Sequence, residues 1–338
     1  MISLYIAIFF TSLLGALIGT PIVRKIALKF RIIDIPSHRK IHLEPIPLLG
    51  GISIAVVFLL AFSLFSKLSS EMLAVFLGSL IIILTGLTDD IKGLSPFLKL
   101  SLQILACWLV VIFGISVSFT NNPAIDIPIT FLWIVGITNA FNLLDNMDGL
   151  SVGIAGIASF FFFLLSFMEG QFLIASLSIT LSGACFGFLR YNFSPAQIFM
   201  GDTGSMFVGF ILSIIGIKLR FAESGLFSFA IPIIVLGLPI FDTTLVTISR
   251  LISGKKVSEG GRDHTSHRLV LLGLSHAKAV LSLYFIGIIL GTFTLILSRL
   301  IIPQVFIVLL FLVLFLFGLV FFGRIKSNEK KEKIKQNT

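Results

Sequence analysis

The chain has 338 residues, of which 57% are hydrophobic and only 12% are charged, and its mean hydropathy is +1.09. Soluble domains carry about 25% charged residues, so this composition excludes an ordinary soluble enzyme and indicates a membrane-embedded protein. The net charge of +9 does not indicate nucleic acid, because a nucleic-acid binder needs its basic residues clustered on a polar surface. We therefore expect contact with membrane lipid and no nucleic-acid partner.

Apolar segments follow one another along almost the whole chain and predict an all-α fold, a polytopic integral membrane protein. A helix needs about 20 apolar residues to cross the hydrocarbon core of a bilayer. Eleven segments reach or approach that length, and we interpret each as a transmembrane helix. In chain order they are residues 2–23, 51–66, 72–88, 97–119, 127–144, 152–167, 172–189, 206–217, 225–248, 279–297 and 304–322. The ninth contains Pro232 and Pro239, which we expect to kink it.

The distribution of Lys and Arg predicts the orientation of these segments. Of the 25 basic residues, 21 fall on the side that holds the C-terminus and four fall on the other side. Because basic residues concentrate in cytoplasmic loops, the N-terminus is expected outside and the C-terminus in the cytoplasm. We expect a multi-pass protein of the cell inner (plasma) membrane, with one membrane-embedded domain at 1–323 and a basic cytoplasmic tail at 324–338.

The first polar motif on the cytoplasmic side is the pair Asp89 and Asp90, which follows the third segment. Adjacent carboxylates at a helix C-terminus repel each other and the negative end of the helix dipole, so they need a cation or a proton. Lys99 lies just inside the next segment. The pair therefore favours a metal-binding or proton-transfer role over a plain loop.

A second motif closes the fifth segment, where Asn139, Asn142 and Asp145 are spaced at i, i+3 and i+6. On a helix these side chains line one face. Asp148 and Gly149 follow directly. Polar groups at the rim of a membrane helix indicate that something polar binds there. The alternative is a solvated helix end followed by an Asp-Gly turn.

Two further loops on the same side carry groups suited to phosphate. In the loop 190–205, Gly201 and Gly204 flank Asp202 at the start of a helix. This arrangement suits a metal-bound phosphate, and an Asp that caps the helix without a ligand is the alternative. The loop 255–278 holds two histidines and two arginines within seven residues, which are donors for phosphate or diphosphate oxygens. These four residues are Arg262, His264, His267 and Arg268. Neither a cysteine nor a third nearby histidine supports zinc.

Taken together, the polar residues predict phosphoryl transfer. Hard oxygen ligands without soft ones favour Mg²⁺, with Mn²⁺ as a second candidate, and Lys, Arg and His supply the positive charge. Asp242, near the inner end of the ninth segment, is a further functional candidate, and pairing with a neighbouring helix is the alternative. Because the polar groups lie at one rim, we expect one soluble substrate and one lipid phosphate. A membrane transporter for nucleotide sugars or other anions is the alternative, but its site would lie near the bilayer midplane.

In this order the motifs resemble those of the polyprenyl-phosphate N-acetylhexosamine-1-phosphate transferases, an integral membrane family. The resemblance runs from Pro45 to about His276. Its motifs are Asp89–Asp90, Asn139–x–x–Asn142–x–x–Asp145–x–x–Asp148–Gly149–Leu150, Pro195–Ala196–x–x–Phe199–Met200–Gly201–Asp202–Thr203–Gly204–Ser205, and the His/Arg loop. The peptidoglycan branch of this family carries a run of three histidines, whereas His264 and His267 are separated here. This favours the branch that uses UDP-N-acetylglucosamine or related amino sugars and undecaprenyl phosphate.

The resemblance implies Mg²⁺-dependent transfer of an N-acetylhexosamine 1-phosphate, with N-acetylglucosamine as the expected sugar, from a UDP-sugar to undecaprenyl phosphate. UMP is released, and the step is the first membrane step of cell-envelope polysaccharide synthesis. An active site on the cytoplasmic face is implied, and a homodimer is left open.

The resemblance also assigns roles to individual residues. It implies catalytic roles for Asp89, Asp90 and Asp145, of which the Asp89–Asp90 pair handles the lipid phosphate, and metal binding by Asn142 and Asp202. Substrate contacts are implied for a phosphate-binding lysine, for three residues of a uridine pocket and for four residues that clamp the diphosphate and sugar. In that order these are Lys99, then Asp148, Asn192 and Phe199, then Arg262, His264, His267 and Arg268.

Two positions depart from the family pattern. Members often show Asp-Gly-x-Asp-Gly, whereas the second position here is Asn146, so the backbone near the nucleotide is expected to differ slightly. The family's Pro-Arg-x-Gly-Gly is Pro47–Leu48–Leu49–Gly50–Gly51 in this chain, which removes one cation.

Overall fold

The computed structural model of the chain describes residues 2–35, 44–65, 69–118, 120, 122–221, 226–256, 261–299 and 310–325. The predicted basic tail lies outside the described residues from position 326 onward, and so do residues 36–43 and 257–260 of two predicted cytoplasmic loops.

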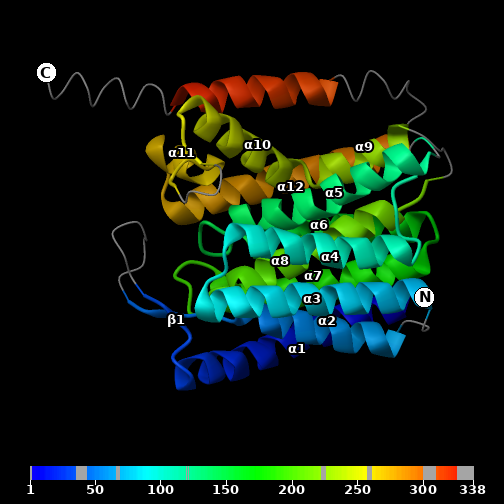
Figure 1. The fold of residues 1–338 in the computed structure, drawn as a ribbon, viewed down its shortest axis with the longest axis horizontal. Coiled ribbons are helices and arrows are strands. Elements are labelled where there is room, and N and C mark those ends of the chain that lie inside the picture. Colours follow the sequence, from blue (N-terminus) through cyan, green and yellow to red (C-terminus); the bar gives the residue numbers. More distant parts are fainter. Residues whose placement is uncertain are drawn as a thin grey trace, which may run out of the picture.

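Helices make up almost all of the described fold (Figure 1). Two short strands, β1 (Ile33–Asp34) and β2 (Ile46–Pro47), pair in an antiparallel manner. A helix over Leu310–Ile325 follows the labelled ones, and we call it the 310–325 helix. The labelled helices are α1 (Ile2–Lys29), α2 (Gly50–Phe65), α3 (Ser70–Lys92), α4 (Pro96–Ile112), α5 (Pro123–Leu144), α6 (Leu150–Met168), α7 (Phe172–Asn192), α8 (Gly201–Lys218), α9 (Leu226–Val235), α10 (Gly237–Ile252), α11 (Thr265–Leu271) and α12 (His276–Leu297).

The helices confirm an all-α, polytopic membrane protein. Within the described residues, seven helices are long and apolar enough to cross a membrane, and the bent pair α9–α10 makes up to eight spans. Three shorter apolar helices occur at Gly50–Leu64, Pro96–Ile112 and Leu310–Ile325. Each of the eleven predicted segments overlaps one of these helices. The number of spans and their orientation stay predictions.

The kink predicted from the two prolines is confirmed as a sharp bend. The axes of α9 and α10 differ by 74° at a break that contains Leu236. Pro239 has no N–H, so it cannot donate to the carbonyl of Val235 four residues before it, and the helical hydrogen-bond series is interrupted there. Because of the bend, α10, which carries Asp242, runs in a different direction from α9.

Helix α8 lies at the centre of the bundle, because every residue from Thr203 to Ile217 is buried. It packs against α2, α3 and α5. A Cβ on Gly51 would lie 2.1 Å from the Cα of Gly204, so α2 meets the first turn of α8 backbone to backbone. A Cβ on Gly86 would lie 2.3 Å from the Cα of Thr203, so α3 does the same. These two contacts fix the position of the start of α8.

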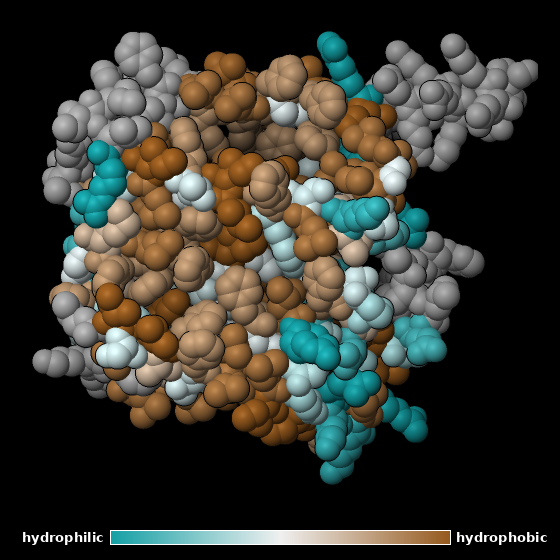
Figure 2. All heavy atoms as spheres, turned by 180° about the vertical axis from the view of Figure 1, so that it is seen from behind, coloured by the Kyte–Doolittle hydropathy of each residue, from teal (hydrophilic) through white to brown (hydrophobic). Residues whose placement is uncertain are grey.

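Polar and apolar residues separate along the length of the bundle. The C-terminal ends of α3 and α5 lie at the same end as the N-terminus of α8, α11 and β1, on the left of Figure 1. Figure 2, which shows the opposite side, places most of the hydrophilic side chains at that end and apolar side chains over much of the rest of the visible face. The predicted polar motifs therefore gather at one end of the bundle.

Candidate active site

Asp90 holds the first turn of α8. Its carboxylate accepts hydrogen bonds from the N–H groups of Asp202 (2.8 Å) and Thr203 (3.1 Å) and from the Thr203 hydroxyl (2.6 Å). These N–H groups have no partner inside their own helix, so a carboxylate supplied by another helix satisfies them. Gly86, one turn before Asp90, allows the close approach that brings the carboxylate within reach. Both oxygens of Asp90 are thus engaged by the protein itself.

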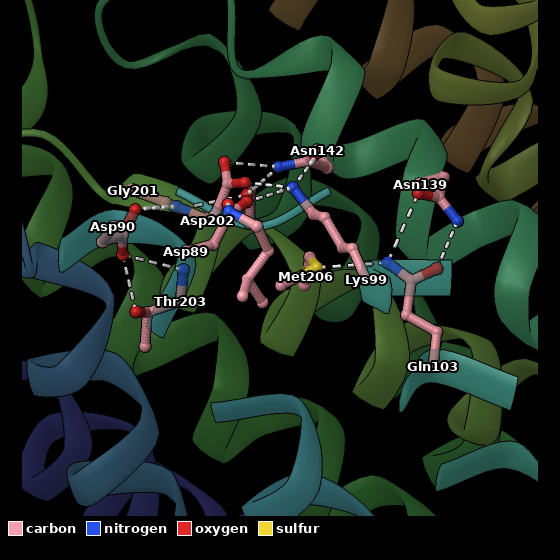
Figure 3. Close-up of polar contacts among 12 residues, drawn as sticks. Asp89, Asp90, Lys99, Gln103, Asn139, Asn142, Gly201, Asp202, Thr203 and Met206 are labelled. Atoms are coloured by element: carbon pink, nitrogen blue, oxygen red, sulfur yellow. Dashed lines mark hydrogen bonds and ion pairs between the residues drawn. The ribbon is translucent and has the colours of Figure 1, made fainter. Parts of the chain in front are cut away.

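Asp89, its neighbour, belongs to a different group of side chains. One oxygen of Asp89 accepts the Leu94 N–H at 2.5 Å, and the other lies 2.9 Å from the ammonium of Lys99. The same ammonium contacts the carboxylate of Asp202 and lies 3.3 Å from Oδ1 of Asn142. Figure 3 shows these side chains converging from four helices. We call Asp89, Lys99, Asn142 and Asp202 the carboxylate cluster.

Local sequence explains how the cluster is assembled. Ser95 caps α4 and Pro96 occupies its first turn, which places Lys99 one turn inside the helix and next to the end of α3. Asn142 lies in the last turn of α5, and its amide donates to Asp202 at 2.8 Å and to the Ser205 hydroxyl at 2.9 Å. The C-terminal ends of α3 and α5 and the N-terminal ends of α4 and α8 therefore meet at the cluster.

The cluster is suited to hold positive charge. The Lys99 ammonium lies among oxygens of Asp89, Asn142 and Asp202, so the protein places its own cation where these oxygens converge. Carboxylate and amide oxygens are also the ligands that Mg²⁺ and Mn²⁺ prefer, and in kind the donor set fits such an ion. Among the residues that the structure describes, no group of three or more His, Cys, Asp or Glu side chains forms a ready-made metal site. Metal binding by Asn142 and Asp202 stays a prediction.

Not all of the polar face predicted on α5 points to the cluster. Asn139 donates to Gln103 at 2.6 Å and accepts from it at 3.3 Å (Figure 3). Gln103 also contacts the sulfur of Met206 at 3.1 Å. Gln103 is not among the residues predicted from the sequence, although its position four residues after Lys99 places both side chains on one face of α4. An amide pair of this kind supports the helix interface beside the cluster.

The segment after α5 brings Asp145 and Asp148 to the same end. Asp145 caps the C-terminus of α5, and burial together with the nearby carboxylates of Asp202, Asp90 and Asp148 raises the pKa of Asp145 to about 8. Asp148 accepts the N–H of Ala196 at 3.0 Å. Asp145 therefore lies within electrostatic reach of the cluster, whereas Asp148 fixes the loop that precedes α8.

Asn192 is committed to the loops around the predicted nucleotide site. Its side-chain oxygen accepts the Gly149 N–H at 3.1 Å, and its amide donates to the Ile198 carbonyl at 2.9 Å. Only 2% of the residue is exposed. Phe199 is partly buried, and its backbone bonds to Pro47. The contacts of Asn192 give it a structural role, and the uridine contacts predicted for Asn192 and Phe199 stay predictions.

The glycine pair Gly50–Gly51, which this chain shares with the family motif, serves packing. The N–H groups of Gly50 and Gly51 donate to the carbonyls of Phe199 and Met200, both at 2.9 Å. The backbone approaches another backbone and holds the residues that lead into α8.

Helix α11 carries the His/Arg motif, and Asp242 of α10 holds its start. One oxygen of Asp242 lies 2.7 Å from Nδ1 of His264, and the other accepts the Thr265 N–H at 2.6 Å. The Ser266 hydroxyl donates to Asn146 at 2.6 Å, which joins α11 to the segment after α5. Asn146, one of the two positions that depart from the family pattern, thus connects α11 to the loop next to the carboxylate cluster.

Arg268 is engaged by the protein on all sides. Its guanidinium donates to the carbonyls of Asp263 and Phe322 and to the hydroxyl of Ser249, and the residue is 0% exposed. The Asp263 carboxylate in turn binds Arg250 through two hydrogen bonds of 2.9 Å. This geometry does not favour the direct diphosphate contact predicted for Arg268, because its donors hold α11 against α10 and the 310–325 helix.

His267 and Arg262 are placed differently from Arg268. Arg262 is exposed, and His267 is partly buried with its ring centroid 6.1 Å from that of His264. Burial, together with electrostatic effects of the neighbouring His264 and Arg262, lowers the pKa of His267 to about 4, so its ring is neutral at pH 7 in the free protein. Neither His267 nor Arg262 is buried as deeply as Arg268, and contacts of the two with a ligand stay predictions.

The chain is similar to known proteins. The model of the family described as glycosyl transferase family 4 matches residues 72–220. A Bacillus subtilis protein named probable undecaprenyl-phosphate N-acetylglucosaminyl 1-phosphate transferase is 40% identical over 310 residues, which cover 88% of this chain and 86% of that protein. The chain belongs to the polyprenyl-phosphate N-acetylhexosamine-1-phosphate transferase family.

Two other relatives show the breadth of this transferase family. The decaprenyl-phosphate N-acetylglucosaminephosphotransferase of Mycolicibacterium smegmatis is 32% identical over 79% of this chain and 76% of that protein. A phospho-N-acetylmuramoyl-pentapeptide-transferase of Prochlorococcus marinus is 32% identical over 75% of this chain and 77% of that protein. The chain is therefore a membrane-embedded glycosyl-1-phosphate transferase of cell-wall biogenesis.

Proposed function

We propose that this transferase moves N-acetylglucosamine 1-phosphate from UDP-N-acetylglucosamine to undecaprenyl phosphate, with release of UMP, at the cytoplasmic face of the plasma membrane. The observation that carries the proposal is the carboxylate cluster, in which one ammonium is held among oxygens at one end of a membrane bundle. The names of the Bacillus and Mycolicibacterium relatives support the sugar, and the name of the Bacillus relative supports the lipid.

The reaction exchanges one phosphoanhydride for another. An oxygen of the lipid phosphate attacks the phosphorus that carries the sugar, a new P–O bond forms, and the bond to UMP breaks. The bonding electrons leave with UMP, so no oxidant or reductant is needed. The two anhydrides have similar energies, and we expect the reaction to run in both directions.

The two adjacent carboxylates divide the work. Asp90 uses both oxygens to hold the start of α8, so we assign it the positioning of Asp202. Asp89 faces Lys99, and we assign these two to the lipid phosphate: the ammonium attracts it and the carboxylate orients the ammonium. The second pKa of a phosphate monoester is about 6, so much of it is already ionised at pH 7 and needs little help from a base. Positioning is therefore the main role that we propose for Asp89.

Asp202 and Asn142 are the residues that would hold Mg²⁺ or Mn²⁺. When bound, such an ion neutralises negative charge on the transferred phosphoryl group. Lys99 contacts the same oxygens in the described structure, so the protein keeps them paired with positive charge. Arg262, His264 and His267 are the proposed donors to the diphosphate and sugar, and Asp145, whose pKa is about 8, is proposed to act as a protonated neighbour of the cluster.

The experiment is exchange of labelled UMP into UDP-N-acetylglucosamine by the purified protein in detergent micelles with lipid-linked product and Mg²⁺. Each of a panel of UDP-N-acetylhexosamines is then tested as donor to undecaprenyl phosphate. We expect exchange and forward transfer with UDP-N-acetylglucosamine, and loss of both with EDTA. Transfer with a different sugar alone would overturn the proposed donor, and absence of exchange with every sugar would overturn the proposed reaction.

A further inference from the structure

Asp242 is a carboxylate buried between α10 and α11, with 1% of its side chain exposed. A carboxylate so deeply buried is unfavourable unless it is paired and hydrogen-bonded. Asp242 meets this need with one imidazole, that of His264, and one backbone N–H, that of Thr265. The choice of an imidazole as partner has a chemical consequence.

The carboxylate determines which nitrogen of His264 carries a hydrogen. An ionised carboxylate can only accept, so the Nδ1 that lies 2.7 Å away is the donor. Nε2 lies on the other side of the ring, and within the described part of the chain no hydrogen bond occupies it. A ring held in this way donates from Nε2 only when it carries a positive charge, and the carboxylate is then its counter-ion.

A contact of Ser266 links α11 to the segment that follows α5. Ser266, two residues after His264, is bonded to Asn146, and Asp145 beside Asn146 is within electrostatic reach of Asp202. We propose that Asp242 is a positioning residue, which holds His264 so that its Nε2 donates to the diphosphate of the nucleotide-sugar donor as part of a charge-paired Asp–His unit. The inference rests on the proposed function, because it names the group that a residue of that site recognises.

The first test compares Asp242→Asn with a matched control, Asp126→Asn. Asp126 is also buried, at 5% exposure, and accepts one backbone N–H and one side-chain hydrogen, both from Thr120 at 2.9 and 3.0 Å. It lies in the first turn of α5, at the end of the helix opposite to Asn142. In Asp242→Asn the amide oxygen still serves the Thr265 N–H, but the charge is lost and an NH₂ group faces the imidazole.

We expect Asp242→Asn to raise KM for UDP-N-acetylglucosamine about tenfold or more, because a charged donor to the diphosphate becomes a neutral one. KM for the lipid phosphate is expected to change less than about twofold, and Asp126→Asn to change neither. A merely structural role would reduce the amount of active enzyme and leave KM for the donor unchanged. An unchanged KM for the donor in folded Asp242→Asn overturns the proposal.

A second pair of variants decides the question even if Asp242→Asn does not fold. In His264→Asn the amide nitrogen reaches the place of Nδ1 and keeps the bond to Asp242, whereas in His264→Gln it reaches the place of Nε2. We expect His264→Asn to keep its Tm and lose donor affinity, and His264→Gln to lose Tm and keep more of that affinity. Normal donor affinity in His264→Asn overturns the proposal. An inactive wild type would instead overturn the proposed function, so the two failures are distinguishable.

Discussion

The carboxylate cluster and helix α11 are both dense in charge, but they use it differently. In the cluster, charged side chains contact one another, as when Lys99 lies between Asp89 and Asp202. Around α11, most charged groups serve the protein's own framework: Arg268 donates to two carbonyls and a hydroxyl, and Asp242 accepts from a backbone N–H. A cluster of side chains can rearrange around a ligand, whereas groups that hold backbone cannot do so without loss of structure.

Not every charged residue in a motif of this protein is therefore placed to bind a ligand. Four cationic or titratable residues in the His/Arg loop suggest one clamp, yet Arg268 is fully buried and Arg262 is exposed. Asp89 and Asp90 differ in the same way at the other end of the comparison: Asp89 contacts the side chain of Lys99, whereas Asp90 accepts the backbone N–H of Asp202. Substitutions of residues that contact other charged side chains should change kinetics. Substitutions of residues that hold backbone groups in place should change stability.

The largest effect is expected at the cluster, from Asp202→Asn. This change removes one of the two residues proposed to hold the metal, and we expect turnover to fall about a thousandfold or more while the protein stays folded in detergent. The measurement is UMP release at saturating Mg²⁺, with thermal unfolding as the control for folding. Activity near that of the wild type, with normal metal affinity, would remove Asp202 from the site.

The next prediction separates the two adjacent carboxylates. Asp89→Asn should lower kcat about a hundredfold with little change in donor KM, because it faces Lys99 rather than the nucleotide. Asp90→Asn should lower the free energy of unfolding by about 1–3 kcal/mol. The carboxylate accepts from the N–H groups of Asp202 and Thr203 and from the Thr203 hydroxyl, and an amide, with one oxygen instead of two, leaves one of these donors without an acceptor. Kinetics and Tm of the two variants decide this assignment. An acidic limb of the pH–rate profile that stays unchanged in Asp89→Asn would argue against a proton-accepting role.

A third prediction applies the same comparison to α11. Arg268→Gln should reduce the free energy of unfolding by about 2–4 kcal/mol, because it leaves buried acceptors without their donor. His267→Ala should leave Tm nearly unchanged and raise donor KM about tenfold, which corresponds to about 1.4 kcal/mol of lost binding. The outcome that contradicts the division is a stable Arg268→Gln protein whose only defect is donor affinity.

The smallest effect concerns pH and Asp145. Its pKa of about 8 lies above the value of about 3.9 for an unfolded Asp, so between these values the folded protein binds more protons than the unfolded chain. The contribution of Asp145 to stability is therefore present at low pH and is lost as pH rises through about 8. In metal-free buffer, Tm of the wild type should fall between pH 5 and pH 8.5 by a few degrees more than Tm of Asp145→Asn. Parallel curves for the two proteins would show that Asp145 is ionised throughout.

The sequence predicted the helices and the meeting of the motifs for physical reasons that are local. Long apolar runs specify membrane helices, and motifs placed at alternate helix ends must lie at one end of the bundle. That Asp89, Lys99, Asn142 and Asp202 lie at one end of the bundle follows from this rule, and the bend near Pro239 follows from a missing N–H. The chemical roles of these residues stay predictions.

What the sequence left open depends on direction and on distant contacts. Asp89 and Asp90 differ by about 100° around the axis of α3, so neighbours in sequence face different partners. No pattern identifies which of them meets the start of α8. The burial of Arg268 is equally hidden, because its acceptor is a backbone carbonyl of Phe322, and every residue has a carbonyl. The pairing of Gln103 with Asn139 needs the register of two helices, which apolar periodicity does not specify.

The bond between Arg268 and the Phe322 carbonyl has a consequence for the timing of synthesis. The two residues are 54 positions apart, and Phe322 lies in the last turns of the 310–325 helix, where carbonyls lack partners within the helix. At about 5–20 residues per second, a ribosome takes about 3–11 seconds to add that stretch. During this interval a nascent chain holds α11 through Ser249 and Asp263 but lacks the third acceptor. The donor-binding side of the enzyme is therefore completed after the cluster, and a chain interrupted between these positions would carry an assembled cluster beside an α11 that lacks one of the three Arg268 contacts.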